Sequence, residues 1–443
     1  MITKPKGTKD IYGKEGDSWL YVSNLLDNLM KKYNYNYIRT PIFESTELFH
    51  RGVGDNTDLV QKETYDFKDR GDRNITLRPE GTAGVVRSYI ENKMYGNTEQ
   101  PTKYYYNGTM YRYERPQAGR YREFSQFGFE LIGSDDEISD AEMISIPYNF
   151  LKMLGLNGVT VKINTLGDKE SRDNYRQTLI DYFKPHIEEL CEDCKNRLEK
   201  NPLRVLDCKV DNELEIMKNA PRTIDYLNES SKERYEKVKE YLNILQVEFE
   251  ETPSLVRGLD YYDHTVFELF ATVASKDMAI GGGGRYNGLV ELLGGPATPA
   301  VGYAAGMDRV MLALEEENIT VGDSKAVDVF LMYVNEDEKK YATFLAQELR
   351  MNGFVVELEY LGRSLKSQFK QADRLESKFL MILNSEDLDN NQVKIKNNKT
   401  KEEELIDLDY IVYFLDENLE DEPCECGDDC DCDGEHGCGC NHE

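Results

Sequence analysis

Two strand-like runs joined by a short turn, between residues 104 and 132, constrain the fold more than any other stretch of the sequence. The first run is rich in tyrosine, the turn holds Pro116 and Gly119, and the second run alternates in character. This pattern predicts an antiparallel hairpin, in which successive side chains of a strand point to opposite faces. The chain must therefore build a sheet around it.

The two faces of the second strand differ in chemistry. Phe127, Phe129 and Leu131 predict an apolar core on one face. The other face combines basic, aromatic, amide and acidic residues with two charged residues in phase on the first strand: Arg122, Phe124, Gln126, Gly128 and Glu130, with Arg112 and Glu114. This set suits a pocket for a charged, planar ligand, to which a strand glycine allows close approach. A solvated sheet face is the alternative interpretation.

Four elements are predicted before the hairpin, namely an amphipathic helix at residues 17–33 and strands at residues 37–43, 63–67 and 75–77. Pro41 lies inside the first strand and favours an edge or an interface, because proline cannot donate to the ladder. Residues 79–82 resemble a helix start with Thr82 as its cap. Free amides at a helix N-terminus can bind a ligand, so Glu80 is either a binding residue or an exposed acid.

The sequence after the hairpin changes character at about residue 168. A helix at residues 140–154 and a strand at residues 159–164 are predicted first. Residues 168–250 then read as an inserted domain of charged helices. Cys191, Cys194 and Cys208 lie within it and make an incomplete zinc set, so cysteines that do not bind a metal are favoured over a zinc site.

Strand-like and glycine-rich sequence returns after residue 250. Residues 257–268 read RGLDYYDHTVFE, residues 281–284 are all glycine, and residues 301–314 lead into an apolar helix that carries Arg309. A glycine run is often a flexible loop. The apolar residues around this one favour a backbone that passes beside a ligand instead.

Alternation of strands and helices over residues 327–415, with a last strand at residues 393–396, predicts a compact α/β domain. The second helix of this domain, at residues 364–374, and its flanks carry a row of basic residues: Arg363, Lys366, Lys370, Arg374 and Lys378. Such a row is equally consistent with a solvated surface and with nucleic-acid contact. Residues 416–443 hold twelve acids, six cysteines and two histidines. This tail cannot bury a core, so we expect it to be disordered without a ligand, and metal capture is a hypothesis for it.

Length and charge set further limits. A chain of 443 residues is too long for one core, so two or three domains are expected. The net charge of −29, or about −17 without the tail, argues against non-specific nucleic-acid binding but allows local basic patches. The sequence has neither an apolar run of membrane-spanning length nor a secretory signal. We therefore expect a cytoplasmic protein with no membrane partner.

Together these segments resemble the histidyl-tRNA synthetases, a family of class II aminoacyl-tRNA synthetases. The helix and strand that end at Pro41 are similar to motif 1 of that class, the hairpin to motif 2, and residues 301–314 with Arg309 to motif 3. RGLDYYDHTVFE and GGGGRYNGL look like the two peptides peculiar to the histidine enzyme, and RPEGTAG precedes the hairpin as in that family. The resemblance covers residues 1 to about 415.

The resemblance implies an α+β catalytic domain with an antiparallel sheet, a helical insertion and a C-terminal α/β anticodon-binding domain. The expected boundaries are residues 1–167 and 251–322 for the catalytic core, 168–250 for the insertion, 323–415 for the anticodon-binding domain and 416–443 for the tail. The resemblance also implies a homodimer, with motif 1 at its interface.

The roles of individual residues follow from the same resemblance. Arg112 and Arg257 are expected to be catalytic and to approach the α-phosphate of ATP from opposite sides. The residues expected around ATP are Arg112, Arg120, Arg122, Phe124, stacked on adenine, and Arg309. Those expected around histidine are Glu80, Gly81, Thr82, Arg112, Gln126, Glu130, Arg257, Tyr261 and Tyr262. A pocket that hydrogen-bonds both imidazole nitrogens would reject apolar competitors.

The implied reaction joins L-histidine to tRNA(His) through a histidyl-adenylate, with ATP and Mg²⁺ as the substrate complex, no prosthetic group and no metal site. The alternative is a histidine-sensing regulatory paralogue that serves ATP phosphoribosyltransferase without charging tRNA. Such paralogues typically lack the C-terminal domain and lose parts of the active site. This chain keeps Arg112, Arg257, Arg309 and residues 327–415.

Overall fold

The computed structural model describes residues 1–54, 57–208, 210–273, 276–322 and 327–419. The chain divides into two compact units, Met1–Gly322 and Asp323–Glu443. Within the described ranges, no helix combines the length and the apolar character needed to cross a membrane. The tail predicted at residues 416–443 begins inside a helix, α14 (Ile411–Leu419), so the expected disorder is wrong for residues 416–419. The rest of the predicted tail, residues 420–443, lies outside the described residues.

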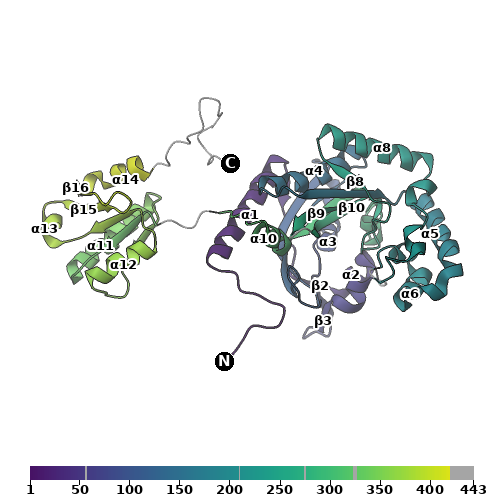
Figure 1. Ribbon diagram of the computed structural model, residues 1–443, viewed down its shortest axis with the longest axis horizontal. Coiled ribbons are helices and arrows are strands. Elements are labelled where there is room, and N and C mark those ends of the chain that lie inside the picture. The colour runs from purple at the N-terminus through teal and green to yellow at the C-terminus, as the bar shows by residue number, and fades with distance from the viewer. Residues whose placement is uncertain (55–56, 209, 274–275, 323–326, 420–443) are drawn as a thin grey trace. The chain divides into compact units, whose positions relative to one another are not determined.

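An eight-stranded sheet organises the first unit, in the order β1-β5-β6-β11-β10-β9-β7-β8 (Figure 1). Its strands are β1 (Asn36–Tyr37), β5 (Thr102–Tyr111), β6 (Glu123–Ile132), β7 (Val159–Thr165), β8 (Phe249–Glu251), β9 (Asp263–Val273), β10 (Lys276–Arg285) and β11 (Ala300–Gly306). The strands between the two edges pair antiparallel in the spatial order β5-β6-β11-β10-β9-β7, which confirms the predicted antiparallel sheet. The two short edge strands, β1 and β8, pair in parallel.

The predicted hairpin is confirmed as β5 and β6, which pair from Thr102 opposite Ile132 to Tyr111 opposite Glu123. β6 also pairs with β11, so it lies inside the sheet. Its apolar face, including Phe127, belongs to the largest apolar cluster of the unit. The opposite, polar face of the same strand is therefore free to line a site.

The described part of the first unit contains ten α-helices: α1 (Lys14–Lys32), α2 (Thr46–Val53), α3 (Thr82–Glu91), α4 (Glu137–Met153), α5 (Lys169–Phe183), α6 (Glu192–Lys200), α7 (Glu215–Lys218), α8 (Glu229–Ile244), α9 (Leu289–Leu292) and α10 (Met307–Glu316). Helices α1, α4, α8 and α10 share the apolar cluster of Phe127. α3 and α9 pack in a second cluster with Tyr106 and Met110, residues of β5. Both faces of the sheet are thus covered in part by helices.

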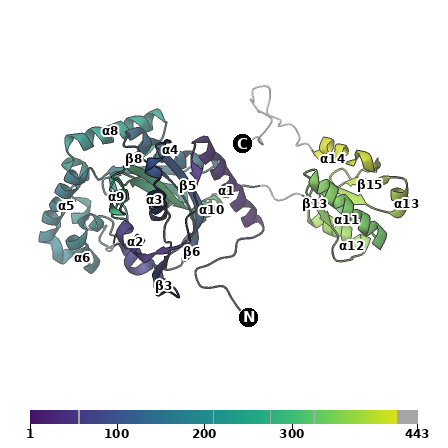
Figure 2. The ribbon, with the colours of Figure 1, turned by 180° about the vertical axis from the view of Figure 1, so that it is seen from behind.

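The insertion has an apolar cluster of its own, built by residues of the segment from α5 to α7: Tyr175, Leu179, Phe183, Leu190, Cys194, Leu198, Val205, Cys208 and Ile216. α8 instead packs beside α4, and the two helices lie together in both views (Figures 1 and 2). Only the segment before α8 is therefore independent of the main core in its packing.

The structure differs from the sequence prediction in the segment before the hairpin. Residues 37–43 do not form one strand: β1 ends at Tyr37, and β2 (Phe43–Ser45) joins β4 (Asn74–Leu77) and β3 (Tyr65–Lys68) in a small sheet. Pro41 explains the break, because it lacks an N–H and restricts the residue before it. The four glycines lie inside β10, so they are not a flexible loop.

The start of α3 also differs from the prediction. Thr82 is the first residue of this helix and not its cap, contrary to prediction. The Glu80 carboxylate takes that role, since it accepts hydrogen bonds from the backbone N–H groups of Thr82 and Ala83, at 2.7 and 2.8 Å. A carboxylate at this position also complements the positive end of the helix dipole.

The second unit contains a five-stranded sheet in the order β13-β12-β14-β15-β16. Its elements are β12 (Val329–Met332), α11 (Glu336–Met351), β13 (Val356–Leu358), α12 (Leu365–Arg374), β14 (Phe379–Ile382), α13 (Ser385–Asp389), β15 (Gln392–Asn397), β16 (Glu403–Asp407) and α14 (Ile411–Leu419). The α/β domain is confirmed, but the strand predicted at residues 393–396 is not the last one. β16 was missed because acidic residues dominate its exposed positions.

Candidate active site

A cavity of about 160 Å³ opens on the polar face of the sheet. Its lining includes residues from the hairpin, the loop before β9, β9, β10 and α10: Arg112, Glu114, Arg120, Phe124, Gln126, Arg257, Glu268, Gly281, Gly282 and Arg309. Segments nearly two hundred residues apart in sequence therefore meet at one place. Four arginines in so small a space suit a polyanionic ligand.

Each of the four arginines donates to a protein acceptor, Arg120 Nη1 to Glu114 Oε2 at 3.4 Å. Arg257 Nη1 lies 2.9 Å from Glu268 Oε1, and Arg112 Nε donates to the backbone oxygen of Pro79 at 2.8 Å. Arg309 Nη1 donates to the backbone oxygen of Ala279 at 2.6 Å. A guanidinium has several further N–H donors, so each group is oriented and still able to bind an anion.

The pKa values of two cavity arginines reflect their neighbours. Burial lowers the pKa of Arg309, and the positive charge of Arg120 adds to this effect. Burial alone would also lower the pKa of Arg257, but the charge of Glu268 raises it above its ordinary value. Arg257 thus has a negative charge beside it in Glu268, whereas Arg309 also lies near the positive charge of Arg120.

Phe124 and Arg122 occupy different environments. Phe124 lines the cavity, with the guanidinium carbon of Arg112 5.4 Å from its ring centroid. Arg122 is not among the lining residues: it packs over Tyr113 at 3.8 Å and donates to the backbone oxygen of Glu114. β6 begins only at Glu123, so Arg122 does not follow the alternation of that strand. Its position gives no support to a contact with ATP.

Glu130 forms the centre of a second, buried group. Its side chain is fully buried; Oε1 accepts a hydrogen bond of 2.7 Å from the Thr82 hydroxyl, and Oε2 accepts one from the Tyr286 hydroxyl. Burial raises the pKa of Glu130 to about 8, although both hydrogen bonds act in the opposite direction. The Glu130 carboxyl group can therefore gain or lose a proton near neutral pH.

Tyrosine rings pack around this carboxyl group. The ring centroids of Tyr261 and Tyr262 are 4.6 Å apart, and those of Tyr261 and Tyr286 are 5.6 Å apart. All three side chains are buried. Hydroxyl groups in a buried aromatic pocket can serve a planar ligand with polar ring atoms.

Gln126 connects the buried group to the cavity. It lines the cavity, and its Oε1 accepts hydrogen bonds from the backbone N–H of Gly81, at 3.1 Å, and from the Tyr106 hydroxyl. Glu80 is buried beside it, and this burial raises the pKa of Glu80. The predicted residues of both ligand sets are thus continuous in space, with Arg122 as the exception.

Two glycines are required by close approach. A Cβ atom at Gly302 would lie 1.7 Å from Glu130 Oε2, and one at Gly282 would lie 2.6 Å from Arg257 Nη1. Neither glycine leaves room for another side chain unless the neighbouring charged group moves. The glycine-rich strands therefore make the space that these two residues occupy.

Sequence reasoning missed three residues of the site: Tyr106, Glu268 and Tyr286. Each had a signal. Tyr106 is paired with Gly128 across the hairpin, Tyr286 follows the glycine run, and Glu268 closes the RGLDYYDHTVFE peptide. Periodicity identifies a strand face, but it does not reveal which strands become neighbours.

This combination of a mainly antiparallel sheet, arginines around a cavity on a central hairpin, and an adjoining acidic pocket defines a class II aminoacyl-tRNA synthetase. Residues 7–310 match the family model described as "Histidyl-tRNA synthetase", and residues 328–418 match one described as "Anticodon binding domain". The chain belongs to the histidyl-tRNA synthetase family, and it is an aminoacyl-tRNA ligase.

Individual relatives agree with this assignment. A Histidine–tRNA ligase from Staphylococcus aureus is 51% identical over 418 residues, which cover 94% of this chain and 100% of that protein. The crystal structure of apo S. aureus histidyl-tRNA synthetase superposes with a TM-score of 0.81 at 45% identity, again over 94% of this chain and 100% of that one.

A more distant structure bears on the regulatory alternative. The structure of an "ATP phosphoribosyltransferase regulatory subunit/histidyl-tRNA synthetase" from Bacillus halodurans superposes with a TM-score of 0.61 at 20% identity, over 84% of this chain and 96% of that one. Identity this low shows a shared fold alone. Histidine charging of tRNA is therefore better supported than the regulatory role.

Proposed function

We propose that this chain joins L-histidine to tRNA(His) in two steps, both within the cavity and the pocket around Glu130. One observation carries the proposal. Arg112 and Arg257, which are 145 positions apart in the sequence, line the same cavity. Gln126 in that cavity accepts from the Gly81 N–H, and the next residue, Thr82, donates to the buried carboxyl group of Glu130.

ATP is proposed to occupy the cavity. Arg112 and Arg257 contact its α-phosphate, Phe124 stacks on the adenine, and Arg120 and Arg309 contact the outer phosphates. The lining positions of all five residues support these roles. Guanidinium groups suit phosphate because two parallel N–H bonds can form to one phosphoryl group.

Histidine is proposed to bind in the adjoining pocket. Glu80, Thr82 and Gln126 receive its ammonium group, while Glu130 and the two tyrosines of the Tyr261–Tyr262 pair surround its imidazole. Glu130 accepts a hydrogen bond when ionised and can donate one when protonated, which matches a ring with one donor and one acceptor nitrogen. An apolar competitor would leave these buried groups unpaired, which gives discrimination of ~10⁴ or more without editing.

The first step makes histidyl-adenylate. A histidine carboxylate oxygen attacks the α-phosphorus, a new P–O bond forms, and the bond to the bridging oxygen breaks so that pyrophosphate leaves. The nucleophile is already a carboxylate, so no residue has to remove a proton from it. Arg112 and Arg257 stabilise the charge that builds on the α-phosphoryl oxygens, and their orientation by Pro79 and Glu268 supports this role.

The second step transfers histidine to tRNA. A hydroxyl group of the terminal ribose attacks the acyl carbon, and AMP leaves with the electrons of the broken C–O bond, while the hydroxyl proton passes to a phosphate oxygen of the leaving AMP. The same arginines hold the leaving phosphate, since it is the group that they bound in the first step.

Mg²⁺ is proposed to accompany ATP. It usually binds through one or two carboxylates, substrate phosphates and water. Glu114 and Glu268 both line the cavity, so the donor set fits such an ion. When bound, the ion would neutralise phosphate charge.

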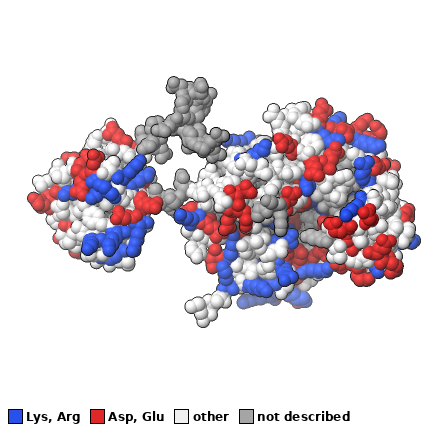
Figure 3. All heavy atoms as spheres, in the orientation of Figure 1, with Lys and Arg blue, Asp and Glu red and all other residues white. Residues whose placement is uncertain are grey.

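The second unit is proposed to bind the anticodon region of the tRNA. Figure 3 shows Lys and Arg gathered at the lower edge of this unit, in a protein that is acidic overall. We further propose a homodimer that works in the cytoplasm, where ATP and tRNA are found. Tyr37 lies in the segment similar to motif 1, and Ile42 and Phe43 follow it directly. Their exposed fractions are 54%, 39% and 59%, which supports an interface there.

Two assays test the proposal. The chain should exchange labelled pyrophosphate into ATP only when histidine is present, and it should attach histidine to tRNA(His) transcript. Binding of histidine without exchange would favour the regulatory alternative and contradict the proposal. A chromatographic mass measurement of the Phe43→Arg variant beside the parent tests the dimer separately.

A further inference from the structure

Four side chains capable of binding a metal meet inside the insertion: Cys191, Cys194, Cys208 and Asp211. One ligand atom from each, three sulfurs and one carboxylate oxygen, lie within 4.8 Å of one another. Cys194, Cys208 and Asp211 are buried, and Cys191 is partly exposed. The sequence supplies three cysteines with zinc-like spacing, and the fold adds the fourth group.

The distance between two of the sulfurs fits a shared metal. Cys191 Sγ and Cys208 Sγ are 3.8 Å apart. A tetrahedral site with Zn–S bonds of about 2.3 Å has ligand atoms roughly 3.8 Å apart. A disulfide bond would require a separation of about 2.05 Å. The thiols are therefore arranged as metal ligands are, and not as a bonded pair.

The local backbone brings the ligands together in two equal halves. Cys191 immediately precedes α6, and Cys194 lies in its first turn. Cys208 and Asp211 repeat the same three-residue step. A hydrogen bond joins the halves, since the Cys191 N–H donates to Asp211 Oδ2 at 3.0 Å. Within the second half, the Asp211 N–H donates to Cys208 Sγ at 3.4 Å and orients that ligand. Supports of this kind are typical of metal sites.

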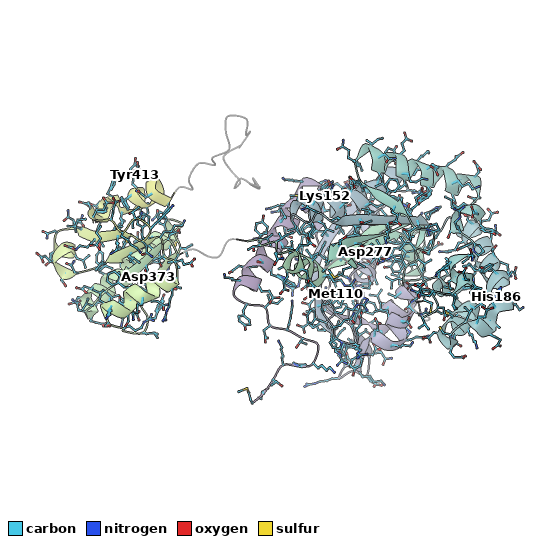
Figure 4. All side chains as sticks on the ribbon, in the orientation of Figure 1. Met110, Lys152, His186, Asp277, Asp373 and Tyr413 are labelled. Carbon is cyan, nitrogen blue, oxygen red and sulfur yellow. The ribbon has the colours of Figure 1, made fainter. Side chains whose placement is uncertain are left out.

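Asp211 is hard to explain without a cation. Its side chain sits beside an apolar cluster that contains Cys194 and Cys208, and the residue is 4% exposed. Among the described residues, no Lys, Arg or His lies within ion-pair distance of it, and its neighbours are the three thiols. A buried carboxylate is costly unless it is paired or coordinates a metal. His186, labelled in Figure 4, pairs instead with Glu189 at 2.8 Å and is outside the cluster.

We propose that Cys191, Cys194, Cys208 and Asp211 bind one Zn²⁺ as a closed, four-coordinate structural site. Three thiolates and one carboxylate are ligands that zinc accepts, and a set of four protein ligands leaves no open position for catalysis. The ion connects the start of α6 to the segment that contains Cys208 and Asp211.

Hydrogen bonds connect the insertion to the loop that carries Arg257 in the active site. Beyond α6, Asn201 Nδ2 donates to Asp260 Oδ1 at 2.7 Å, and Arg204 Nη1 donates to the backbone oxygen of Gly258 at 3.1 Å. Both acceptors lie in the loop between β8 and β9, directly after Arg257. Loss of the ion should therefore loosen this loop, which carries Arg257 as well as Tyr261 and Tyr262. We expect a lower kcat for pyrophosphate exchange together with a higher KM for histidine.

Zinc content of the full chain tests the proposal. The six tail cysteines are replaced by serine in every protein compared, so that tail thiols cannot contribute. We expect about one zinc per chain after dialysis, and loss of most of it in Cys208→Ser and in Asp211→Asn, which conserves volume. A metal-free chain after purification and refolding with zinc would overturn the proposal, and so would full zinc content in Asp211→Asn.

Cobalt provides a second readout that does not depend on variants. The same background protein, stripped of zinc by a chelator and loaded with Co²⁺, should show the visible absorption of tetrahedral, thiolate-bound cobalt. A spectrum of six-coordinate cobalt would contradict the site. A mass two hydrogens lower under non-reducing conditions, without zinc, would show a disulfide in its place.

Discussion

Arg257 and Glu268 form an ion pair of 2.9 Å inside the cavity that Arg112 also lines. Their side chains are 20% and 23% exposed, so a ligand can still reach them. The carboxylate holds the guanidinium in place before ATP arrives, and Gly282 leaves it the necessary space. Preorganisation of this kind removes the need to reorient a charge during the reaction.

Replacement of this arginine tests its role. Arg257→His should lower histidine-dependent ATP–pyrophosphate exchange by at least ~10²-fold, because one preorganised donor at the α-phosphate is lost. The thermal midpoint should change little. Arg222→His is the matched control, since Arg222 pairs with Asp225 on the surface of the insertion. Exchange at the parental rate would remove Arg257 from the mechanism.

A glycine prediction tests the buried pocket. Gly302→Ala places a methyl group where Glu130 Oε2 now lies, so the carboxyl group must move away from Tyr286. We expect the KM for histidine to rise at least ~10-fold, as expected for one displaced hydrogen-bonding group, with a smaller change in the KM for ATP. Gly288→Ala is the control, because a Cβ atom there meets nothing within 4 Å. Equal KM values for parent and Gly302→Ala would show that this contact is irrelevant to histidine.

The sequence predicts most of the fold because the decisive patterns are local. Alternation along β6 separates the apolar face of Phe127 from the polar face of Glu130, and the structure has both as predicted. The break at Pro41 shows the limit of such patterns. Strand propensity extended across residues 37–43, while a single missing N–H divided them between two sheets.

The site was less accessible to sequence reasoning where it depends on neighbours. Tyr286 donates to Glu130 only because β10, β11 and β6 are adjacent, which no period in the sequence specifies. Asp211 was missed for the same reason. An aspartate among many acids carries no signal until Cys191 and Cys208 are seen beside it.

The raised pKa of Glu130 predicts a pH dependence of stability. The carboxyl group titrates near 4.5 when unfolded and at about 8 when folded. Between these values the folded state binds the extra proton, so this contribution to stability is full below pH 4.5 and is lost as the pH rises through 8. The Glu130→Gln variant has no carboxyl group at this position, so its stability does not fall with pH for this reason. The free energy of unfolding of the variant, relative to the parent, should therefore increase by up to about 1.4 kcal/mol per pH unit.

Thermal unfolding of the parent and Glu130→Gln at several values between pH 5 and 8 measures this slope. The trend with pH decides the prediction, because the substitution also alters the hydrogen bonds with Thr82 and Tyr286. A constant difference between the two proteins would mean that Glu130 is ionised throughout this range.

Substitutions on the basic face of α12 can test tRNA binding separately from amino-acid activation. Lys366, Lys370 and Arg374 lie at helical spacing on this element, whereas Arg363 and Lys378 at its flanks pair with Glu359 and Asp328. Replacement of the three helix residues by glutamine should weaken tRNA(His) binding and lower its salt dependence, because phosphate contacts release bound counterions.

The same variant should keep the parental rate of pyrophosphate exchange, since that reaction needs histidine and ATP but no tRNA. Aminoacylation at subsaturating tRNA should fall about 10-fold or more, and the loss should shrink as tRNA approaches saturation. Lys339→Gln with Lys340→Gln is the control, because both lysines pair with acids on α11. Unchanged tRNA affinity in the α12 variant would mean that this face is only solvated surface, and that the second unit binds tRNA through other residues.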